Sequence, residues 1–471
     1  MVISIKNLRL KFSGVEEKLF DGLNIDVHQG EKVLMLGPSG SGKTTLLQVM
    51  SGIIPRSIDI AHKADELVID DYASVVFQNP DSQFCMPTVG EELAFILENR
   101  CIPTEQMESK IEDVLQTVRL DVSLDKSIEN LSGGMKQRLA IASSLLQQAN
   151  TWFLDEPTSM LDPNATNHLW DVIQYIWQDK TVIIVEHKVE QVWNYVDRVI
   201  LMNYDGEVIA SNTPNQILLQ FEEQLESFGV WYPGAWNNRP EIIQKAHNPT
   251  DTKGILYGHD LIAKRGDKTL WHCDRFEFHS GQWITLEGDN GTGKSTFFEM
   301  LMQLIPYDGD IYYDDEQLQS IKMAAQSIYY VYQNPELQFV MNTVFEELYI
   351  NTYNGQKEQA TKQTEDMLKL LKLDHVKTLH PYELSVGQKR RLSVATAILS
   401  RADVLLLDEP TFGLDSHNTF ELIKLIQQLK NEGKLIITIT HDEQILEMYS
   451  DVRWIIKDLS LIHISEPTRP R

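Results

Sequence analysis

The sequence is poor in cysteine. Only Cys85, Cys101 and Cys273 occur among its 471 residues, and none of them belongs to a CxxC pair. An odd number of scattered cysteines does not build a disulfide framework, which excludes a small disulfide-stapled scaffold. We therefore expect reduced thiols in a cytosolic protein, with the cysteines packed as small buried hydrophobic residues.

Basic residues are also scarce. The chain has 42 Lys and Arg residues against 68 Asp and Glu residues, which gives a formal net charge of −26. A sequence-independent nucleic-acid binder needs a Lys/Arg footprint to neutralise phosphates, so this balance opposes nucleic acid as a main partner. The composition predicts a protein that does not bind nucleic acid.

Long apolar runs are missing as well. No stretch approaches the roughly 18 uncharged apolar residues of a membrane-spanning helix. The N-terminus, MVISIKNLRLKF, lacks the charged and then apolar organisation of a signal peptide. We expect any role at a membrane to depend on a partner.

The sequence does contain an internal repeat. Five short motifs occur in the same order twice, and each recurs about 250 residues further on. Two copies predict two nucleotide sites in one chain. The matching pairs are Lys43 and Lys294, Gln78 and Gln333, Ser132 and Ser385, Asp155-Glu156 and Asp408-Glu409, and His187 and His441.

Apolar runs of strand length surround these motifs. Residues 32–36 and 283–286 lead into glycine-rich loops, and the runs 151–154 and 404–407 end next to paired carboxylates. They lack polar alternation, which is typical of strands buried on both faces, and helical stretches separate them. The predicted fold is α/β: two tandem P-loop cassettes, each with a mostly parallel sheet and flanking helices. Polar stretches rich in helix formers, at 88–130 and 343–383, predict a helical subdomain in each copy.

We expect a first ATP-binding domain at 1–214, a linker at 215–250 and a second ATP-binding domain at 251–458. The linker begins with apolar residues at helical spacing, which predict an amphipathic helix docked on the first domain. These residues are Leu218, Phe221, Leu225 and Phe228. The aromatic stretch 231–236 that follows reads as a packed turn, and a partner surface is the alternative. The final segment, 459–471, looks like translated read-through, so we expect it outside the fold.

Each glycine-rich loop fits the pattern G-x-x-x-x-G-K-[ST]. Its glycines let backbone N–H groups surround a phosphate, its lysine reaches the β- and γ-phosphate oxygens, and Thr44 or Ser295 is expected to hold Mg²⁺. The expected ATP-binding residues are Gly37, Pro38, Ser39, Gly40, Ser41, Gly42, Lys43, Thr44 and Thr45 in the first copy, and Gly288, Asp289, Asn290, Gly291, Thr292, Gly293, Lys294, Ser295 and Thr296 in the second.

The paired carboxylates complete a hydrolytic site. Two adjacent acids at the end of an apolar strand are costly unless they face a cation, so Asp155 and Asp408 are expected near the metal. Glu156 and Glu409 are the expected general bases for the attacking water. The histidines after the next strand, His187 and His441, are expected to contact the γ-phosphate and hold the catalytic geometry.

These motifs resemble the ATP-binding cassette (ABC) ATPases over about residues 1–458. The family signature is present as LSGGM at 131–135, followed by Lys136-Gln137-Arg138. The resemblance implies two cassettes paired head to tail, so that the signature of one caps the ATP of the other. Ser132, Gly133 and Gly134 are then expected at the ATP bound by Lys294. Ser385 and Gly387 are expected at the ATP bound by Lys43.

The sequences QNPDSQFCMPTVGEELAF and QNPELQFVMNTVFEELYI are similar to the Gln loops of energy-coupling factor (ECF) importer ATPases. The resemblance implies an ATP- and Mg²⁺-dependent subunit at the cytoplasmic face of the cell membrane. A transmembrane subunit and a substrate-binding membrane subunit would be its partners, and a vitamin, a vitamin precursor or a metal ion its transported solute. It also implies that Gln78 and Gln333 bind Mg²⁺ and relay the nucleotide state. We expect Phe84, Met86, Phe339 and Met341 to line the groove for the membrane partner.

Two departures from the family pattern predict that the halves are not equivalent. Val386 stands where the signature has glycine, and a β-branched residue limits close backbone approach to a phosphate. The adenine-stacking aromatic aligns with Phe12 in the first half but with Arg265 in the second. Arg265 can stack through its guanidinium plane, and Tyr257 is the other candidate.

Two other functions remain in view. One is a soluble two-cassette factor acting on the ribosome or on nucleic acid, which would favour basic arms and a charged helical linker. The other is a non-hydrolysing scaffold, which the presence of both glutamates and both histidines opposes. The linker EEQLESFGVWYPGAW is acidic and aromatic, and the chain is strongly acidic overall, so the importer ATPase is favoured.

Overall fold

The computed structural model describes residues 1–158, 161, 163–242, 254–265, 268–289, 291–353 and 355–464. The chain forms two compact units. The first comprises Met1–Asn237 with Asp415–His417, and the second comprises the rest of the described chain.

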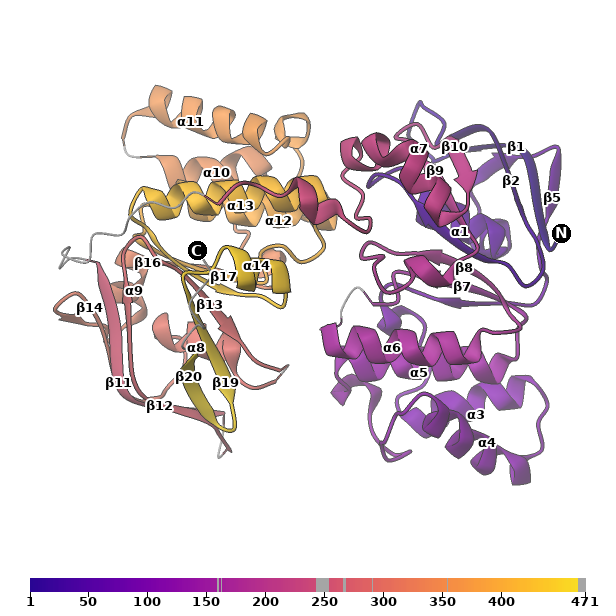
Figure 1. Ribbon diagram of the computed structural model, residues 1–471, viewed down its shortest axis with the longest axis horizontal. Helices are drawn as coiled ribbons and strands as arrows, with labels where there is room; N and C mark the ends of the chain where they lie inside the picture. Colours follow the sequence, from indigo (N-terminus) through magenta and orange to yellow (C-terminus); the bar gives the residue numbers. More distant parts are fainter. Residues whose placement is uncertain are drawn as a thin grey trace. The chain divides into compact units, whose positions relative to one another are not determined.

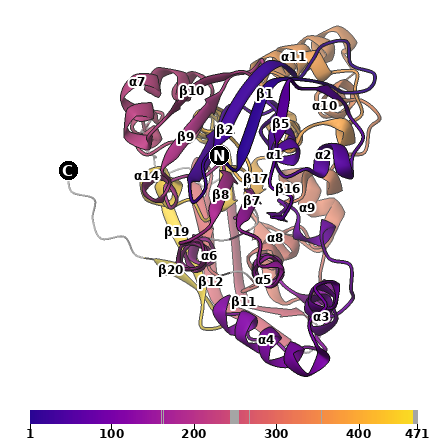
Figure 2. The ribbon, with the colours of Figure 1, turned by 90° about the vertical axis from the view of Figure 1, so that its right-hand side faces the viewer.

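The first unit contains an antiparallel sheet and a mostly parallel one (Figure 1). In the antiparallel sheet, β1 (Ile3–Lys11) pairs with β2 (Phe20–Val27), β4 (Ala61–Lys63) and β5 (Glu66–Val68). Strands β1 and β2 lie side by side in Figure 2 and run in opposite directions. Apolar side chains of both sheets and of the helix after the first glycine-rich loop share one core.

The second sheet has the order β10-β9-β3-β8-β7-β6. All its pairings are parallel except β10 with β9. Every residue of β7 and β8 is buried, as predicted for strands covered on both faces. The strands are β3 (Lys32–Leu36), β6 (Ala73–Val76), β7 (Thr151–Asp155), β8 (Thr181–Val185), β9 (Arg198–Met202) and β10 (Val208–Asn212).

Helices surround this sheet. Helices α3, α4 and α5 pack on one another and form the predicted helical subdomain (Figure 1). The helices of the unit are α1 (Lys43–Met50), α2 (Ile53–Arg56), α3 (Val89–Asn99), α4 (Thr104–Thr117), α5 (Gly133–Gln147), α6 (Pro163–Ile176) and α7 (Pro214–Ser227).

The start of the predicted linker forms the expected helix, with a break at Phe221 (φ −131°, ψ 18°), and Leu225 is the one of the four predicted apolar residues that is buried. Helix α7 contacts β9 and β10, with Ile217 and Leu225 buried. The aromatic turn after it is packed: Trp231 and Tyr232 are buried, and the Trp231 ring lies 5.5 Å from that of Trp236. Packing rather than an open aromatic surface therefore accounts for this stretch. The rest of the predicted linker, from residue 243, lies outside the described residues.

The second unit has one sheet with the order β15-β14-β11-β12-β20-β19-β13-β18-β17-β16. Strands β13, β16, β17, β18 and β19 repeat the parallel arrangement of the first unit. The strands are β11 (Ile255–Arg265), β12 (Lys268–His279), β13 (Trp283–Glu287), β14 (Asp308–Tyr313), β15 (Glu316–Gln317), β16 (Ile328–Val331), β17 (Val404–Asp408), β18 (Leu435–Ile439), β19 (Val452–Lys457) and β20 (Ser460–Ile464).

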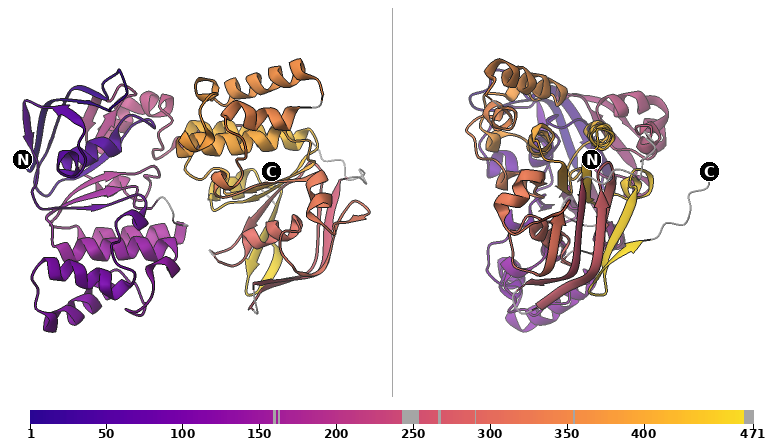
Figure 3. Two further views of the ribbon diagram at one scale, coloured as in Figure 1. Left: turned by 180° about the vertical axis from the view of Figure 1, so that it is seen from behind. Right: turned by 90° about the vertical axis from the view of Figure 1, so that its left-hand side faces the viewer.

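The helical subdomain of this unit consists of α10, α11 and α12, which pack together around a small apolar core (Figure 3). The helices of the unit are α8 (Lys294–Leu301), α9 (Ile321–Ser327), α10 (Val344–Thr352), α11 (Lys357–Leu370), α12 (Val386–Leu399), α13 (Ser416–Asn431, from Asn418 onward) and α14 (Glu443–Met448). Among all the helices described, none combines the length and the apolar character needed to cross a bilayer.

Two sequence expectations are wrong. The segment 459–471 was expected outside the fold, but Ser460–Ile464 pairs antiparallel with β19, and Leu461 is buried in the core. Sheet hydrogen bonding and this buried leucine hold the segment. Residues 465–471 lie outside the described residues. The cysteines were expected to be buried, yet Cys85 and Cys101 are exposed and only Cys273 is buried.

Candidate functional site

The topology brings the predicted motifs to one edge of each sheet. In the first cassette, the glycine-rich loop follows β3, Gln78 lies just beyond β6, Glu156 directly follows β7, and His187 lies just beyond β8. These strands are parallel neighbours, so their carboxyl ends meet at the same edge, where α/β proteins bind their ligands. The second cassette repeats the arrangement with β13, β16, β17 and β18.

The first glycine-rich loop wraps a buried lysine. Lys43 begins α1, and its Nζ donates to the carbonyl oxygens of Gly37 at 2.8 Å and Pro38 at 2.9 Å. Burial lowers the pKa of Lys43 to about 8, while Glu156 and Asp155 oppose the shift. Gly42 has φ 89°, and a Cβ there would lie 2.9 Å from the ring of Phe20. Only glycine therefore fits the turn into α1.

The second loop is built alike. The Nζ of Lys294 donates to the carbonyl oxygens of Gly288 at 2.7 Å and Asp289 at 3.0 Å. Thr292 Oγ1 donates to the same Asp289 carbonyl at 2.8 Å. Asn290 lies outside the described residues. In both loops the lysine is held by backbone carbonyls, contacts that a bound phosphate can replace.

ATP fits the donors of these loops. The N–H groups at the start of α1 and α8 and the buried ammonium groups are the donors that polyphosphate requires. Ser41 adds a buried hydroxyl, and Ser41 Oγ has no hydrogen-bond partner among the described residues. An uncompensated buried hydroxyl is costly, which is consistent with a ligand supplying the missing partner.

Mg²⁺ also fits the residues present. Thr44 Oγ1 donates to Asp155 Oδ1 at 3.2 Å, and Ser295 Oγ donates to Asp408 Oδ2 at 2.8 Å. A hydroxyl and a carboxylate are hard oxygen ligands, and Mg²⁺ commonly uses one or two carboxylates together with substrate phosphates. No cluster of three or more His, Cys, Asp or Glu side chains able to hold a metal occurs in the described part of the chain. The hydroxyl–carboxylate pair of each cassette suits a cation that also binds the phosphates of the nucleotide.

The two predicted bases share an unusual backbone conformation. Glu156 has φ 46° and Glu409 has φ 49°. Both values lie in the left-handed region, which residues other than glycine rarely adopt. Sheet hydrogen bonds hold this geometry: Glu156 N–H donates to Val185 O at 2.8 Å, and Glu409 N–H donates to Ile439 O at 2.9 Å. Strained backbone of this kind clusters at functional sites.

Each base contacts its histidine. His187 Nε2 lies 3.0 Å from Glu156 Oε1, and His441 Nε2 lies 3.5 Å from Glu409 Oε1. In the first cassette, Gln78 Nε2 also donates to Glu156 Oε2 at 2.6 Å. Burial alone would raise the pKa of Glu156, but His187 and Lys43 outweigh it and lower the pKa. Glu156 is thus an anion at neutral pH, the form in which it can accept a proton.

The signature serines have a local role in the structure. Ser132 is the N-cap of α5 and accepts from Met135 N–H. Ser385 is the N-cap of α12 and forms a capping box with Gln388. Helix α12 begins at Val386 just as α5 begins at Gly133, so the valine does not shift the start of the helix. Contacts of either signature with the other cassette's nucleotide remain a prediction.

The two candidates for adenine stacking in the second cassette, Arg265 and Tyr257, lie far apart on β11. Phe12 directly follows β1 and is 38% exposed, and Arg265 is exposed at the end of β11. Tyr257 lies near the opposite end of β11, roughly 26 Å from Arg265 at about 3.3 Å per residue. Its ring stacks on Tyr312, 5.0 Å away. Tyr257 is therefore a poor substitute for the aromatic residue that Arg265 replaces in the second cassette.

Sequence reasoning missed several residues of these sites. Tyr330 Oη donates to Asp408 Oδ2 at 3.2 Å, and Arg390 is buried behind the same strand end. Glu92 and Glu347 are buried, and each accepts two backbone N–H groups of its Gln loop at 2.8–2.9 Å. The repeated EEL of the two Gln-loop sequences was the available signal for the last pair.

Glu186 is a further missed residue, buried beside Glu156 and His187. Its Oε2 accepts from Thr158 Oγ1 at 3.0 Å, and its Oε1 accepts from His187 N–H at 3.1 Å. Burial raises its pKa from 4.5 to about 7, and Glu156 adds to the rise. The second cassette has Thr440 at this position. The native chain therefore holds this proton more tightly than the unfolded chain does, and stability falls as pH rises from about 4.5 to about 7.

We expect Glu186→Gln to stabilise the first cassette at pH 8 by about 1–3 kcal/mol and to change little at pH 4.5. The amide oxygen can accept from His187 N–H, while the amide nitrogen donates to the Thr158 hydroxyl. Calorimetric scans at both pH values measure the effect. The exposed Glu98→Gln is the control for loss of one charge. Equal shifts for Glu186→Gln at both pH values would contradict the expectation.

Comparisons with known proteins agree with this geometry. The family model described as ABC transporter matches residues 20–159 and 272–412, which together exceed half of the chain. A Bacillus subtilis (strain 168) protein provisionally named HMP/thiamine import ATP-binding protein YkoD is 32% identical over 99% of this chain and 92% of its own length. A Streptococcus agalactiae protein provisionally named ABC transporter ATP-binding protein SAG1633 is 33% identical over 98% of this chain and 90% of its own length.

Solved structures share the fold. An archaeal ribosome recycling factor, aABCE1, in complex with ribosomal stalk protein aP1, superposes with a TM-score of 0.66 at 22% identity. A structure named RNase-L Inhibitor gives a TM-score of 0.64, also at 22% identity. In both cases the match covers 95% of this chain and 87% of the other chain. The chain belongs to the ABC transporter family and is an ATPase with two ABC cassettes.

Proposed function

We propose that the chain is the ATP-hydrolysing subunit of an ECF-type importer, which drives uptake of a vitamin, a vitamin precursor or a metal ion. The observation that carries the proposal is the repeated site: in both cassettes a P-loop lysine, a hydroxyl–Asp pair and a Glu–His pair meet beside a Gln loop. The name of YkoD, an HMP/thiamine import ATP-binding protein, supports the solute class.

Within each site the residues have separate roles. Lys43 and Lys294 leave their backbone carbonyls and bind the β- and γ-phosphate oxygens. Glu156 and Glu409 accept the proton of the attacking water, and His187 and His441 hold these carboxylates in place. Mg²⁺, when bound, neutralises charge that develops on the phosphates. Thr44, Asp155 and Gln78 would hold it in the first cassette. Ser295, Asp408 and Gln333 would hold it in the second.

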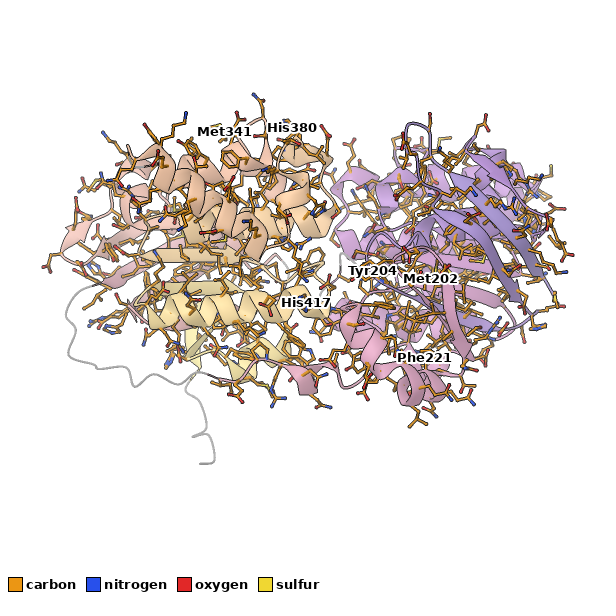
Figure 4. All side chains as sticks on the ribbon, turned by 90° about the horizontal axis from the view of Figure 1, so that it is seen from above. Met202, Tyr204, Phe221, Met341, His380 and His417 are labelled. Atoms are coloured by element: carbon orange, nitrogen blue, oxygen red, sulfur yellow. The ribbon has the colours of Figure 1, made fainter. Side chains whose placement is uncertain are left out.

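The Gln loops offer a surface for a membrane partner. In the second cassette Leu337 is 71% exposed and Val340 is 73% exposed, although both are apolar. The buried carboxylate of Glu347 holds this loop in place by accepting hydrogen bonds from the N–H groups of Val340 and Met341. Figure 4 places Met341 and His380 on the helical part of this unit, outside the sheet. Clustered apolar side chains on a fixed loop are typical of an interaction site.

The structure changes the expected list of groove residues. Phe339 was expected to face the partner, but it is buried in the core of the helical subdomain. Phe84, Met86 and Met341 are only half-buried, so they stay candidates. The exposed neighbours of the two methionines, Cys85 and Val340, are better placed to contact a partner.

We expect Leu337→Asp together with Val340→Asp to lower partner-stimulated ATPase activity by at least tenfold and to leave basal hydrolysis within about twofold, since buried interface anchors carry most binding energy. Co-purification with the membrane subunits should fall in parallel. Two equally exposed apolar residues away from the loop, Leu219 and Tyr175, are the controls for the added charge. Normal stimulation in the double Asp variant would exclude this surface.

An uptake assay tests the proposed function. Host cells lacking the gene are complemented with the wild type or with Glu156→Gln/Glu409→Gln, and uptake of labelled HMP, thiamine and cobalt ion is measured. Uptake of one of these that only the wild type restores supports the proposal. No difference for all three, together with co-sedimentation of the protein with ribosomes, would overturn it in favour of the ribosome-acting alternative. The likeness to aABCE1 shows the fold alone, and the net charge of −26 opposes that alternative.

A further inference from the structure

Helix α12 places a buried arginine at the junction of two functional loops. Arg390 is 3% exposed. Its Nη1 donates to Tyr332 O at 2.9 Å, and its Nη2 donates to Gln333 O at 2.5 Å. Nη1 also reaches Asp408 O at 3.4 Å. One guanidinium thus links the backbone of the Gln loop to the strand end that carries Asp408 and Glu409.

The charge of this guanidinium is compensated locally. Burial lowers the pKa of Arg390 to about 10, while Asp408 and Glu409 oppose the shift, so the side chain is charged at neutral pH. A buried cation is costly unless it is paired and hydrogen-bonded. Hydrogen bonds to three backbone carbonyls hold the guanidinium in place, and the nearby negative charges of Asp408 and Glu409 favour its charged form.

The first cassette lacks this link. Gln137 occupies the matching position on α5, and its Nε2 donates to Gln78 O at 3.3 Å. Its Oε1 is buried and has no hydrogen-bond partner among the described residues. The Gln loop contacts the catalytic carboxylate here through the Gln78 side chain instead. The two cassettes therefore connect Gln loop and base in different ways.

Tyr330 makes the second cassette differ further. Its hydroxyl donates to Asp408 Oδ2, whereas the first cassette has Val75 at the matching position of β6. Burial and the neighbouring Asp408 raise the Tyr330 pKa, so the phenol stays a donor. Asp408 is thus fixed at its side chain by Tyr330 and at its backbone by Arg390.

We propose that Arg390 is a positioning residue of the second cassette, which holds the Gln333 loop and the Asp408–Glu409 strand end in register so that Gln333 and Glu409 are aligned before nucleotide binds. Guanidinium suits this task because its planar fork serves several carbonyl acceptors at once. The proposal rests on Glu409 as the base of this site, which ATP binding and hydrolysis by the Glu156→Gln/Glu409→Gln chain test separately.

The test isolates the second cassette with Glu156→Gln in the full-length chain. We expect Arg390→Gln, which copies the first cassette, to lower kcat by about 10- to 100-fold, the scale of a small misplacement near reacting groups. The KM for ATP should change less than about twofold, and the Mg²⁺ concentration for half-maximal rate should rise. Arg390→Lys keeps the charge without the fork, so it should recover part of kcat.

The matched control is Gln137→Ala with Glu409→Gln, where only the first cassette turns over. This control should keep kcat within about twofold, because Gln137 makes a single long hydrogen bond. An unchanged kcat and Mg²⁺ dependence in Arg390→Gln would overturn the proposal. A kcat loss in both Arg390→Gln and Arg390→Lys that tracks an equal loss of ATP binding and melting temperature would also overturn it, because the arginine would then only support folding. The Arg390 variants are also measured without Glu156→Gln, so that a change in kcat can be detected whether or not the glutamates are the bases.

Discussion

The chain carrying both Glu156→Gln and Glu409→Gln is expected to bind ATP normally and to lose hydrolysis by about 10²–10⁴-fold, the usual contribution of a general base. Glutamine has the shape of glutamate but does not accept a proton at neutral pH. Its amide can still accept from Gln78 or contact the histidine, so the site should keep its geometry. The backbone at both positions has φ near 50°, and this conformation directs a glutamine side chain in the same way as the native glutamate.

Phosphate release measures the expected loss of hydrolysis, and binding of a fluorescent ATP analogue measures the expected retention of nucleotide affinity. The control is a chain with Glu98→Gln and Glu358→Gln, exposed positions that remove the same two charges. Loss of binding together with loss of turnover would show that the glutamates act on nucleotide affinity rather than on the water. Hydrolysis at the wild-type rate in the double variant would exclude both as bases.

The sequence was sufficient to predict the parallel sheets because the signal is local. Buried strands such as β7 and β17 are short, apolar and without alternation, and each ends at an Asp-Glu pair. Within each sheet, neighbouring parallel strands place their carboxyl ends at the same edge. The structure accordingly brings Thr44 to Asp155 and Ser295 to Asp408 within hydrogen-bond distance, although no sequence spacing specifies that contact.

The missed residues depend on tertiary packing. Arg390 belongs to a helix, and Glu186 directly follows a strand. Both are buried, although nothing in the sequence around them indicates it. Tyr330 belongs to an apolar strand, where an aromatic residue is ordinary core. Strand β20 was misjudged because the composition of 459–471 looked foreign, whereas pairing with β19 decides its structure. Such positions become visible only when the neighbouring strand or helix is known.

The two ATP sites are expected to contribute unequally, so that Glu409→Gln lowers turnover more than Glu156→Gln does. In the head-to-tail pairing expected from the family, the site of Lys294 is capped by Ser132-Gly133-Gly134, and the site of Lys43 is capped by Ser385-Val386-Gly387. The start of α12 matches that of α5, so the backbone donors are retained in both caps. Any penalty must then come from a β-branched residue in place of glycine next to the phosphate.

Displacing a γ-phosphate from one well-aimed donor costs on the order of 10- to 1,000-fold in rate. We therefore expect Val386→Gly to raise turnover in the Glu409→Gln chain, where only the site of Lys43 works, and to have little effect in the Glu156→Gln chain. Steady-state phosphate release from the four variants measures this. The contacts of Asp408 with Tyr330 and Arg390 act in the same direction, because they order the site of Lys294. Equal losses from the two single Glu variants, with no gain from Val386→Gly, would show that the valine is tolerated and that the extra contacts of Asp408 do not set the rate.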